Sequence, residues 1–381
     1  MRTPAVLVLE DGSRFPGYAW GTEGIRVGEV VFSTGMTGYQ ETLTDPSYAG
    51  QIVVMTAPHI GNTGMNDEDA ESRQVWVEGF VVRDPSPRPS NFRSERSLEE
   101  DLLSDQVVGI SGVDTRAITL VLRDAGVMRG GIFSGDGYAL SPDAQLEKVL
   151  AGPLMTGQSL ADRVSVSEAR VVPATTEMLG TLAVIDLGIK ESTVRELAAR
   201  GFQVHILPAS STFQEILATE PIALFYSNGP GDPAASDNQV AVLQEALRHG
   251  LPFFGICFGN QLLGRALGLG TYKLKYGHRG INQPVLDKAR GRVEITAQNH
   301  GFAVDAPLEG VIDSPAGFGS VEVSHFSLND NVVEGLRALD IPAFSVQYHP
   351  EAAAGPRDAN YLFDDFRNLV VEHLSTTKGG V

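Results

Sequence analysis

The sequence contains a single cysteine, Cys257, whose surroundings suggest a nucleophile. It stands in the pattern Gly-Ile-Cys-Phe-Gly at residues 255–259, between an apolar run of strand length and a stretch of helical periodicity. Flanking glycines allow a sharp strand-to-helix turn in which a Cβ would be too crowded. The positive end of the following helix favours a thiolate, which an ordinary cysteine forms only to a small extent at pH 7.

A lone cysteine is often just a small buried apolar side chain, so the nucleophile hypothesis requires a base. His349 and Glu351 lie in Gln-Tyr-His-Pro-Glu at residues 347–351, at the end of a possible strand at 344–348. If the chain is extended there, a period of two places both side chains on one side, and Pro350 favours that geometry. The pattern predicts a catalytic Cys–His–Glu triad with His349 as base and Glu351 as its orienter.

Two alternatives apply to the proposed base. Seen alone, His-Pro-Glu is more often a surface turn than part of a catalytic site. His300, in Gln-Asn-His-Gly at residues 298–301, is a rival base, but no acidic residue stands two positions after it. We therefore prefer His349.

Attack of a thiol on an amide requires donors for the oxyanion that forms. Residues 227–233, Ser-Asn-Gly-Pro-Gly-Asp-Pro, end an apolar run with two glycines and two prolines, and can present free backbone N–H groups. The alternative is a plain turn. We predict that the N–H groups of Gly229 and Phe258 form the oxyanion pair.

The elements that position these residues follow from the pattern after Gly180. Apolar runs of strand length alternate there with helix-period stretches, which is typical of a parallel sheet covered on both faces. The runs are residues 181–187, 202–207, 222–226 and 252–256. Ligands bind beyond the carboxyl ends of such strands, so the loops at 188–190, 208–210, 227–232 and 257–259 should line one site.

The first half is different in character. Residues 5–133 are rich in Gly, Val and Thr, with a hairpin signal at residues 10–13 and a helix expected from about Asp114 through Leu122. We expect an α/β protein in which a β-rich α+β N-terminal domain precedes a mostly parallel-sheet C-terminal domain. The expected boundaries are 1–150 for the first domain, 151–179 for a linker and 180–381 for the second.

Composition limits the classes of function. The chain has 381 residues, 42% of them hydrophobic, and a formal net charge of −18, which disfavours nucleic-acid binding and serves solubility or a complementary partner. One cysteine excludes an intrachain disulfide and a thiolate metal site, and suggests a reducing cytoplasm. No apolar run is long enough for a signal peptide or membrane span, so we expect no membrane association.

Taken in order, the segments at 227–233, 255–261 and 347–352 resemble the class I, or triad, glutamine amidotransferases. The resemblance implies attack of Cys257 on the side-chain amide of L-glutamine, release of ammonia and hydrolysis of a glutamyl thioester. His349 would move the protons and Glu351 would support it.

The first half narrows the resemblance to the small subunit of carbamoyl phosphate synthetase. The segments that carry it are Thr-Gly-Met-Thr-Gly-Tyr-Gln-Glu at 34–41, Leu-Thr-Asp-Pro-Ser-Tyr at 43–48, Pro-His-Ile-Gly-Asn at 58–62 and Gly-Val-Asp-Thr-Arg at 112–116. The match extends into the second half with Lys-Tyr-Gly-His-Arg-Gly at 275–280. By matching position, the resemblance implies a glutamine pocket formed by Ser47, Gly229, Gly231, Phe258, Gln261, Asn299, Gly301 and Phe302. Without it, Ser47 would be a turn residue and Phe302 a core aromatic. The family often has His at position 260 and Asn at position 192, where this chain has Asn and Ser.

The resemblance also implies a partner. The sequence has no Walker-type phosphate loop, so ATP and Mg are expected on a separate large subunit, and no cofactor or metal in this chain. That subunit would combine ammonia, bicarbonate and ATP into carbamoyl phosphate for arginine and pyrimidine biosynthesis, in a heterodimer that can assemble further. The rivals are an amidotransferase for another acceptor, a free-standing glutaminase, an inactive interaction subunit and a cysteine peptidase. The first domain argues against the first two, the complete triad against the third, and a small glutamine-type pocket against the fourth.

Overall fold

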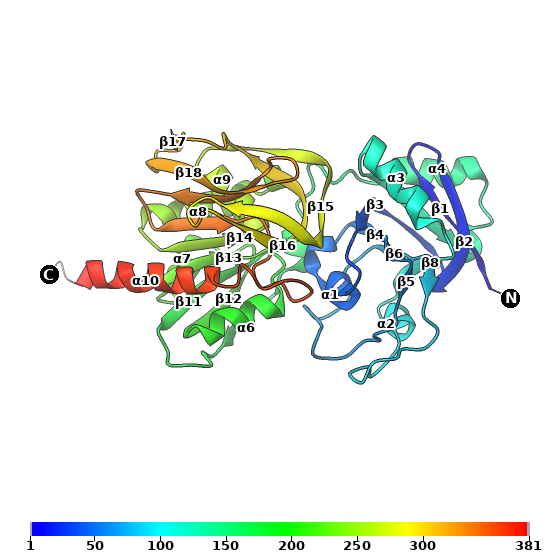
Figure 1. Cartoon of the computed structure of the whole chain (residues 1–381), viewed down its shortest axis with the longest axis horizontal. Coiled ribbons are helices and arrows are strands. Elements are labelled where there is room, and N and C mark those ends of the chain that lie inside the picture. The colour runs from blue at the N-terminus through cyan, green and yellow to red at the C-terminus, as the bar shows by residue number, and fades with distance from the viewer. Residues whose placement is uncertain (1, 379–381) are drawn as a thin grey trace. The chain divides into compact units, whose positions relative to one another are not determined.

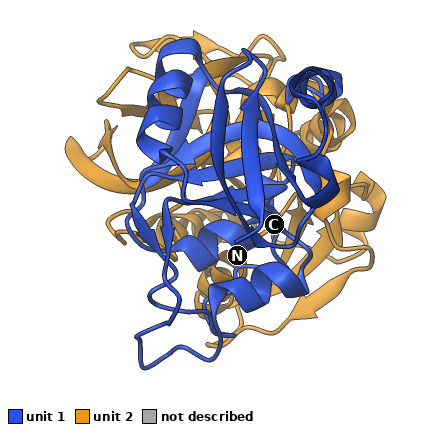
Figure 2. Cartoon of the chain, turned by 90° about the vertical axis from the view of Figure 1, so that its right-hand side faces the viewer, with its two compact units in different colours: residues 1–158, 275–280 blue, residues 159–274, 281–381 orange. Residues whose placement is uncertain are grey.

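The computed structural model describes residues 2–378, which divide into two compact units (Figure 2). Unit 1 spans residues 1–158 together with 275–280, and unit 2 spans 159–274 and 281–381. The first boundary falls within residues 151–179, the segment expected to be a linker. Its later part belongs to unit 2, where Arg170–Val172 pairs with the sheet.

Unit 1 is built on a closed seven-stranded barrel, in the order β1-β2-β8-β6-β4-β3-β9. Its strands are β1 (Pro4–Leu9), β2 (Arg14–Gly21), β3 (Ile25–Ser33), β4 (Gln51–Met55), β6 (Gly79–Val81), β8 (Val108–Ser111) and β9 (Met128–Ser134). The predicted hairpin joins β1 to β2, where the N–H of Leu9 donates to Ser13 O at 2.9 Å and Gly12 has φ +88°. The expectation of a β-rich first half is confirmed.

Among the described residues of unit 1, four helices, two 3-10 turns and one pair of short strands complete the fold. They are α1 (Tyr39–Thr44), α2 (Leu98–Ser104), α3 (Thr115–Ala125), α4 (Pro142–Ala151), the 3-10 turns Pro46–Tyr48 and Gly135–Gly137, and the strand pair β5 (His59–Ile60) and β7 (Asp84–Pro85). Helix α3 begins where the sequence predicted, because Asp114 accepts the N–H of Ala117 at 3.0 Å. Ile118 and Leu122 of this helix are buried in a cluster with residues of the barrel strands.

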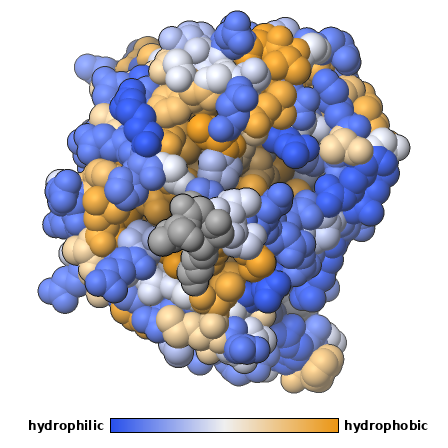
Figure 3. Space-filling model, turned by 90° about the vertical axis from the view of Figure 1, so that its left-hand side faces the viewer, coloured by the Kyte–Doolittle hydropathy of each residue, from blue (hydrophilic) through white to orange (hydrophobic). Residues whose placement is uncertain are grey.

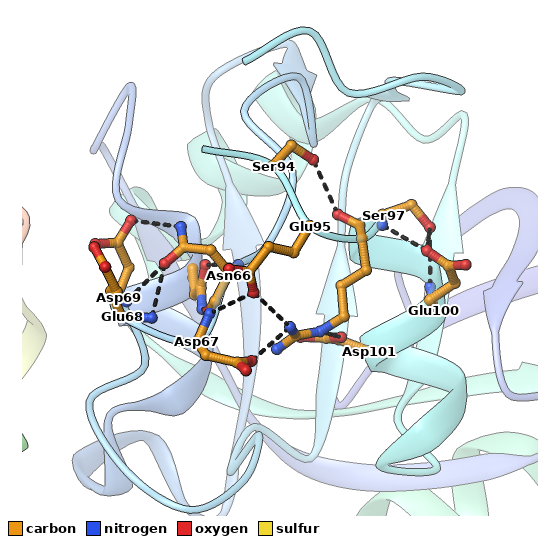
Figure 4. A network of polar contacts seen from close by, with 11 residues as sticks. Asn66, Asp67, Glu68, Asp69, Ser94, Glu95, Ser97, Glu100 and Asp101 are labelled. Carbon is orange, nitrogen blue, oxygen red and sulfur yellow. Dashed lines mark hydrogen bonds and ion pairs between the residues drawn. The ribbon is translucent and has the colours of Figure 1, made fainter. Parts of the chain in front are cut away.

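A network of charged contacts ties together two loops of unit 1 (Figure 4). Arg96 pairs with Asp67 at 2.7 Å and also with Asp101 in α2. Arg93 pairs with Asp69, again at 2.7 Å. Exposed ion pairs contribute little individually, but a network of this kind limits the conformations of the loop that carries both arginines.

Unit 2 contains an eleven-stranded sheet in the order β10-β12-β11-β13-β14-β20-β19-β18-β15-β16, with β17 paired to β18. The strands are β10 (Arg170–Val172), β11 (Gly180–Asp186), β12 (Phe202–Pro208), β13 (Ala223–Tyr226), β14 (Phe253–Ile256), β15 (Gly270–Asp287), β16 (Arg292–Asp305), β17 (Val311–Asp313), β18 (Ser320–Ser327), β19 (Val333–Ala338) and β20 (Ala343–Val346). The four predicted runs are β11 to β14 and they pair in parallel, as expected. Beyond β20 the sheet continues with antiparallel strands, which the sequence pattern did not indicate.

Helices cover both faces of this sheet (Figure 1). One face packs against α7 (Phe213–Leu217), α8 (Asp237–Arg248) and α9 (Phe258–Ala266), and the other against α6 (Glu191–Ala199) and α10 (Leu362–Lys378); α5 (Ala161–Val164) and the 3-10 turn Pro233–Ala235 lie in loops. Successive residues of a strand contribute to opposite faces, so Phe253 packs in one cluster and Phe254 in the other. The predicted α/β architecture is confirmed.

The surface of unit 2 around the end of α10 is mainly hydrophilic, with separate hydrophobic patches (Figure 3). Among residues 2–378, no helix is both long enough and apolar enough to cross a bilayer. Isolated apolar patches of this kind are ordinary on a folded protein.

Removing the cap of α3 should lower stability modestly. We expect Asp114→Ala to reduce the free energy of unfolding by about 1 kcal/mol, because the N–H of Ala117 loses its acceptor. The measurement is urea denaturation followed by circular dichroism. Asp124→Ala, near the carboxyl end of the same helix, is the control and should have no such effect; equal losses for the two variants would contradict the capping role.

Candidate active site

Cys257 occupies a strained turn between β14 and α9. It is the N-cap of α9 with φ 55° and ψ −99°, a backbone conformation that residues with a side chain rarely adopt. Such strain costs about 1–3 kcal/mol and is kept mainly at functional sites. The side chain is buried, with 2% of its surface exposed. The sequence prediction of a strand-to-helix turn at this residue is confirmed.

The two glycines flanking Cys257 are required by close backbone contacts. A Cβ on Gly259 would lie 2.3 Å from Tyr226 O, and one on Gly255 would lie 2.7 Å from the backbone of Gly259. The N–H of Gly259 also donates to Ser227 O at 3.1 Å. The turn is therefore packed directly against the end of β13, and a larger residue at either position would displace it.

His349 and Glu351 form the expected pair, although by a different backbone route. Nδ1 of His349 lies 2.8 Å from Oε1 of Glu351, and both side chains are buried. The strand β20 ends at Val346, and the chain turns at Pro350 instead of continuing extended. The side chains meet because of this turn, and the N–H of His349 is held by Ala297 O at 2.9 Å.

Lys190 supplies a charge that the sequence pattern did not reveal. Its Nζ lies 3.1 Å from Oε1 of Glu351. Lys190 follows β11 in a loop that Asp186 shapes, by accepting the N–H groups of Gly188 and Ile189 at 2.9 and 2.8 Å. The loop at 188–190 was expected at the site, but nothing in the sequence marks this lysine as buried.

The charges of these groups determine their protonation. Burial would raise the pKa of Glu351, but Lys190 and then His349 lower that pKa to about 2. Burial would likewise lower the pKa of His349, but the charge of Glu351 outweighs it, and with the neighbouring Cys257 side chain raises that pKa to about 10. At neutral pH the site therefore holds a carboxylate and an imidazolium.

The second ring nitrogen of His349, Nε2, is buried on the side of the ring away from Glu351. Within the described residues, Nε2 makes no hydrogen bond of normal geometry. The side chain of Cys257 is nevertheless near enough to contribute to the raised pKa of His349. Sγ of Cys257 itself lies 3.6 Å from Asn299 O. The ring is thus free to exchange a proton with the sulfur or with a bound substrate.

Several residues predicted to bind glutamine surround Cys257. Nε2 of Gln261 donates to Phe302 O at 2.9 Å, and Asn299 contacts the sulfur through its carbonyl. A Cβ on Gly229 would lie 2.1 Å from Leu187 O, so the loop after β13 is packed against the loop after β11.

The remaining predicted pocket residues divide between the two units. Phe258 is the first residue of α9 and is buried, Gly231 has φ +103°, and Gly301 lies in β16 next to Phe302. Ser47 lies in unit 1, buried in the turn Pro46–Tyr48, where Asp45 accepts its N–H at 2.9 Å. Its contribution to a glutamine pocket stays a prediction.

His300, the rival base, is already engaged. Its Nδ1 lies 2.9 Å from Phe302 O and its Nε2 lies 3.2 Å from Gln298 Oε1. Both nitrogens therefore face oxygen atoms of neighbouring residues in β16, and Nε2 also lies 3.6 Å from Oε1 of Glu334. This geometry favours His349 as the residue that moves protons at the sulfur.

Comparisons with known proteins agree with this fold. Residues 183–369 match the family model described as "Glutamine amidotransferase class-I", so unit 2 is a domain of that class. Residues 7–132 match the model described as "Carbamoyl-phosphate synthase small chain, CPSase domain".

Whole-chain relatives narrow the class further. The carbamoyl phosphate synthase small chain of Streptomyces coelicolor is 63% identical, with 97% of this chain and 96% of the relative covered. Those of Bifidobacterium longum and Mycobacterium tuberculosis are 56% and 55% identical, each with 96% of this chain covered and 94% and 98% of the relative. The chain belongs to the carbamoyl phosphate synthase small chain family, and it is the glutamine-hydrolysing component of that synthetase.

Replacing Glu351 should lower the pKa of His349, so that the ring is neutral at pH 7. In Glu351→Gln we expect the pKa of His349 to fall from about 10 to below its ordinary 6.5, because burial then dominates. The folded pKa of His349 lies above its ordinary value, so its stabilising contribution is present below pH 6.5 and is lost as the pH rises through about 10. The measurement is NMR titration of labelled histidine, with His349→Gln to assign the signal.

The exposed carboxylate of Glu309 offers a matched control, since Glu309→Gln changes the same functional group at a residue that does not contribute to the pKa of His349. That variant should leave the titration of His349 unchanged. A pKa near 10 that survives in Glu351→Gln would refute an electrostatic origin for the raised pKa of His349.

Proposed function

We propose that unit 2 hydrolyses L-glutamine to glutamate and ammonia through a covalent thioester on Cys257. The observation that carries this proposal is the geometry around His349. Its ring lies 2.8 Å from a buried carboxylate on one side and close to the only sulfur nucleophile of the chain on the other. Substrate binding is assigned to Gln261, Asn299, Gly301 and Phe302, with Gly231 as a further contributor.

In the first half-reaction, the sulfur of Cys257 attacks the carbon of the side-chain amide. A C–S bond forms, and the C=O electron pair moves to oxygen, which accepts hydrogen bonds from the N–H groups of Phe258 and Gly229. The high pKa of His349 favours the state in which the proton of the thiol resides on Nε2. That proton passes to the leaving nitrogen, the C–N bond breaks, and ammonia leaves a glutamyl thioester.

In the second half-reaction, water attacks the thioester. Nε2 of His349, now neutral, takes a proton from the water as the C–O bond forms. The C–S bond then breaks with its electron pair on sulfur, the proton stays on Nε2 as in the starting thiolate–imidazolium pair, and the product gives its carboxyl proton to water as it leaves as glutamate. Glu351 stays ionised throughout, because the charge of Lys190 and the hydrogen bond to His349 hold its pKa low.

The ammonia would pass to a large subunit that makes carbamoyl phosphate from bicarbonate and ATP. Sheltered transfer is chemically sensible, because free ammonia is protonated in water at neutral pH. We assign ATP and Mg to that subunit and no cofactor to this chain. The product would serve arginine and pyrimidine biosynthesis in the cytoplasm, in a heterodimer that can assemble further.

We assign part of the large-subunit contact to residues 86–97 of unit 1, which we call the Phe92 loop. Phe92 is 95% exposed, at the second position of a tight turn in which the N–H of Ser94 donates to Asn91 O at 3.1 Å. The ion pairs of Arg93 with Asp69 and of Arg96 with Asp67 hold this loop in place. A pre-ordered exposed aromatic is the kind of residue that anchors protein interfaces.

Replacing the nucleophile should separate the two activities of the complex. In the complex reconstituted with the large subunit, we expect Cys257→Ser to abolish glutamine-dependent synthesis of carbamoyl phosphate. Synthesis from ammonium should be largely retained, because the large subunit would carry that chemistry. Loss of both activities, or of neither, would contradict the proposed division of labour.

The Phe92 loop can be tested through binding alone. We expect Phe92→Ser to weaken the complex with the large subunit by about tenfold or more, because the aromatic ring would no longer be buried on association. The measurement is surface plasmon resonance. Met178→Ser removes another exposed apolar side chain, 55% exposed in unit 2, and should bind like the unaltered protein; equal affinity of all three proteins would exclude this contact.

A further inference from the structure

Gln347 lies between the helix of the nucleophile and the segment of the base. It is fully buried, directly follows β20 and stands two residues before His349. Its Oε1 accepts hydrogen bonds from Asn260 Nδ2 at 3.1 Å and from Gln261 Nε2 at 3.2 Å. One carbonyl oxygen therefore joins the first turn of α9, which begins just after Cys257, to the chain that carries His349.

The contact with Gln347 fixes the orientation of the Gln261 side chain. Nε2 of Gln261 donates to Phe302 O at 2.9 Å as well as to Gln347 Oε1. Both of its N–H groups are thus used, and a flip of the amide would place its oxygen against two acceptors. The carbonyl oxygen of Gln261 remains as the group that can accept a hydrogen bond from the amino or amide N–H groups of glutamine.

Asn260 takes part in the same arrangement. Its Oδ1 accepts the hydroxyl of Ser345 in β20 at 2.8 Å, while its Nδ2 donates to Gln347. The backbone N–H of Gln347 donates in turn to Glu334 O at 2.8 Å. The side chain of Asn260 therefore serves to tie α9 to β20, and the position of Gln347 is fixed from β19 as well.

One part of Gln347 is left unsatisfied. Among the described residues, its Nε2 is buried and has no hydrogen-bond partner. An unpaired buried donor is unfavourable, and an apolar side chain of similar size would avoid it. The two hydrogen bonds made by Oε1 are therefore the feature that distinguishes glutamine from an apolar residue at this position.

We propose that Gln347 is a positioning residue for glutamine hydrolysis. It holds the Gln261 amide in the orientation that binds glutamine, and it sets the first turn of α9 against the segment of His349. This inference rests on the proposed function, because it assigns Gln261 to the glutamine pocket. Its effect should fall mainly on glutamine binding, since Gln347 acts on the sulfur and the ring only through their backbone elements.

The test compares two substitutions by steady-state glutaminase kinetics in the reconstituted complex. We expect Gln347→Met, which removes the acceptor at similar volume, to raise the KM for glutamine about tenfold or more and to lower kcat less. At this fully buried position the carboxyl group of Gln347→Glu should stay protonated, so it keeps a carbonyl oxygen as acceptor and should keep KM within about threefold of the unaltered value. Ammonium-dependent synthesis should be unchanged in both.

A matched control separates positioning from general stability. Gln239 in α8 is also buried, and its Nε2 donates to Ala209 O at 3.1 Å. Gln239→Met should lower the melting temperature without changing KM. An unchanged KM in Gln347→Met, or an equal rise of KM in Gln239→Met, would overturn the proposal.

Two further outcomes are decisive in the same experiment. If Gln347→Met fails to fold, a tenfold rise of KM in Gln347→Glu would overturn the proposal, because that variant keeps the acceptor. If instead the unaltered complex shows no glutaminase activity, the proposed function fails and not the role of Gln347.

Discussion

The buried negative charge of Glu351 is the constraint on which the rest of the site depends. A carboxylate with almost no exposed surface is stable only if opposite charges compensate its lost hydration. Lys190 and His349 provide that compensation from two different loops. The negative charge of Glu351 is stabilised by the His349 imidazolium, and it also raises the pKa of His349 and so keeps the proton on that ring. One ion pair therefore serves both the stability of the fold and the proposed proton transfer.

This arrangement needs three chain segments to end at the same edge of one sheet. Lys190 follows β11, Cys257 follows β14, and His349 follows β20, and these strands belong to the parallel part of the sheet. Parallel pairing brings their carboxyl ends together, as is general for open α/β sheets. Gly229 and Gly259 pack so closely against neighbouring backbones that neither position has room for a Cβ. This packing fixes the positions of the loops.

Much of this could be predicted from sequence because the signals are local. The strand-to-helix turn at Cys257, the hairpin at residues 10–13 and the cap at Asp114 each depend on neighbours within a few positions. The pairing of His349 with Glu351 was predicted for the wrong backbone reason, because the chain turns at Pro350 where an extended segment was expected.

What escaped prediction depends on contacts far apart in sequence. Lys190 meets Glu351 across 161 positions, and a lysine after a strand is normally exposed, so no local pattern marks it. The antiparallel extension of the sheet likewise follows from pairing between distant segments. Residues 275–280 group with unit 1, where Lys275 O and Arg279 O accept the backbone N–H groups of Val127 and Thr34. The roles of Gln347 and Asn260 become visible only through their shared hydrogen bonds.

The central claim is that Cys257, served by a charged imidazole, becomes covalently attached to the glutamyl group during turnover. Its most direct measurement is rapid acid quenching of the protein with L-glutamine, followed by digestion and mass spectrometry of the peptide that contains Cys257. The account predicts a glutamyl thioester on this peptide that forms at least as fast as ammonia is released. Steady release of ammonia while Cys257 remains unmodified at every time point would contradict it.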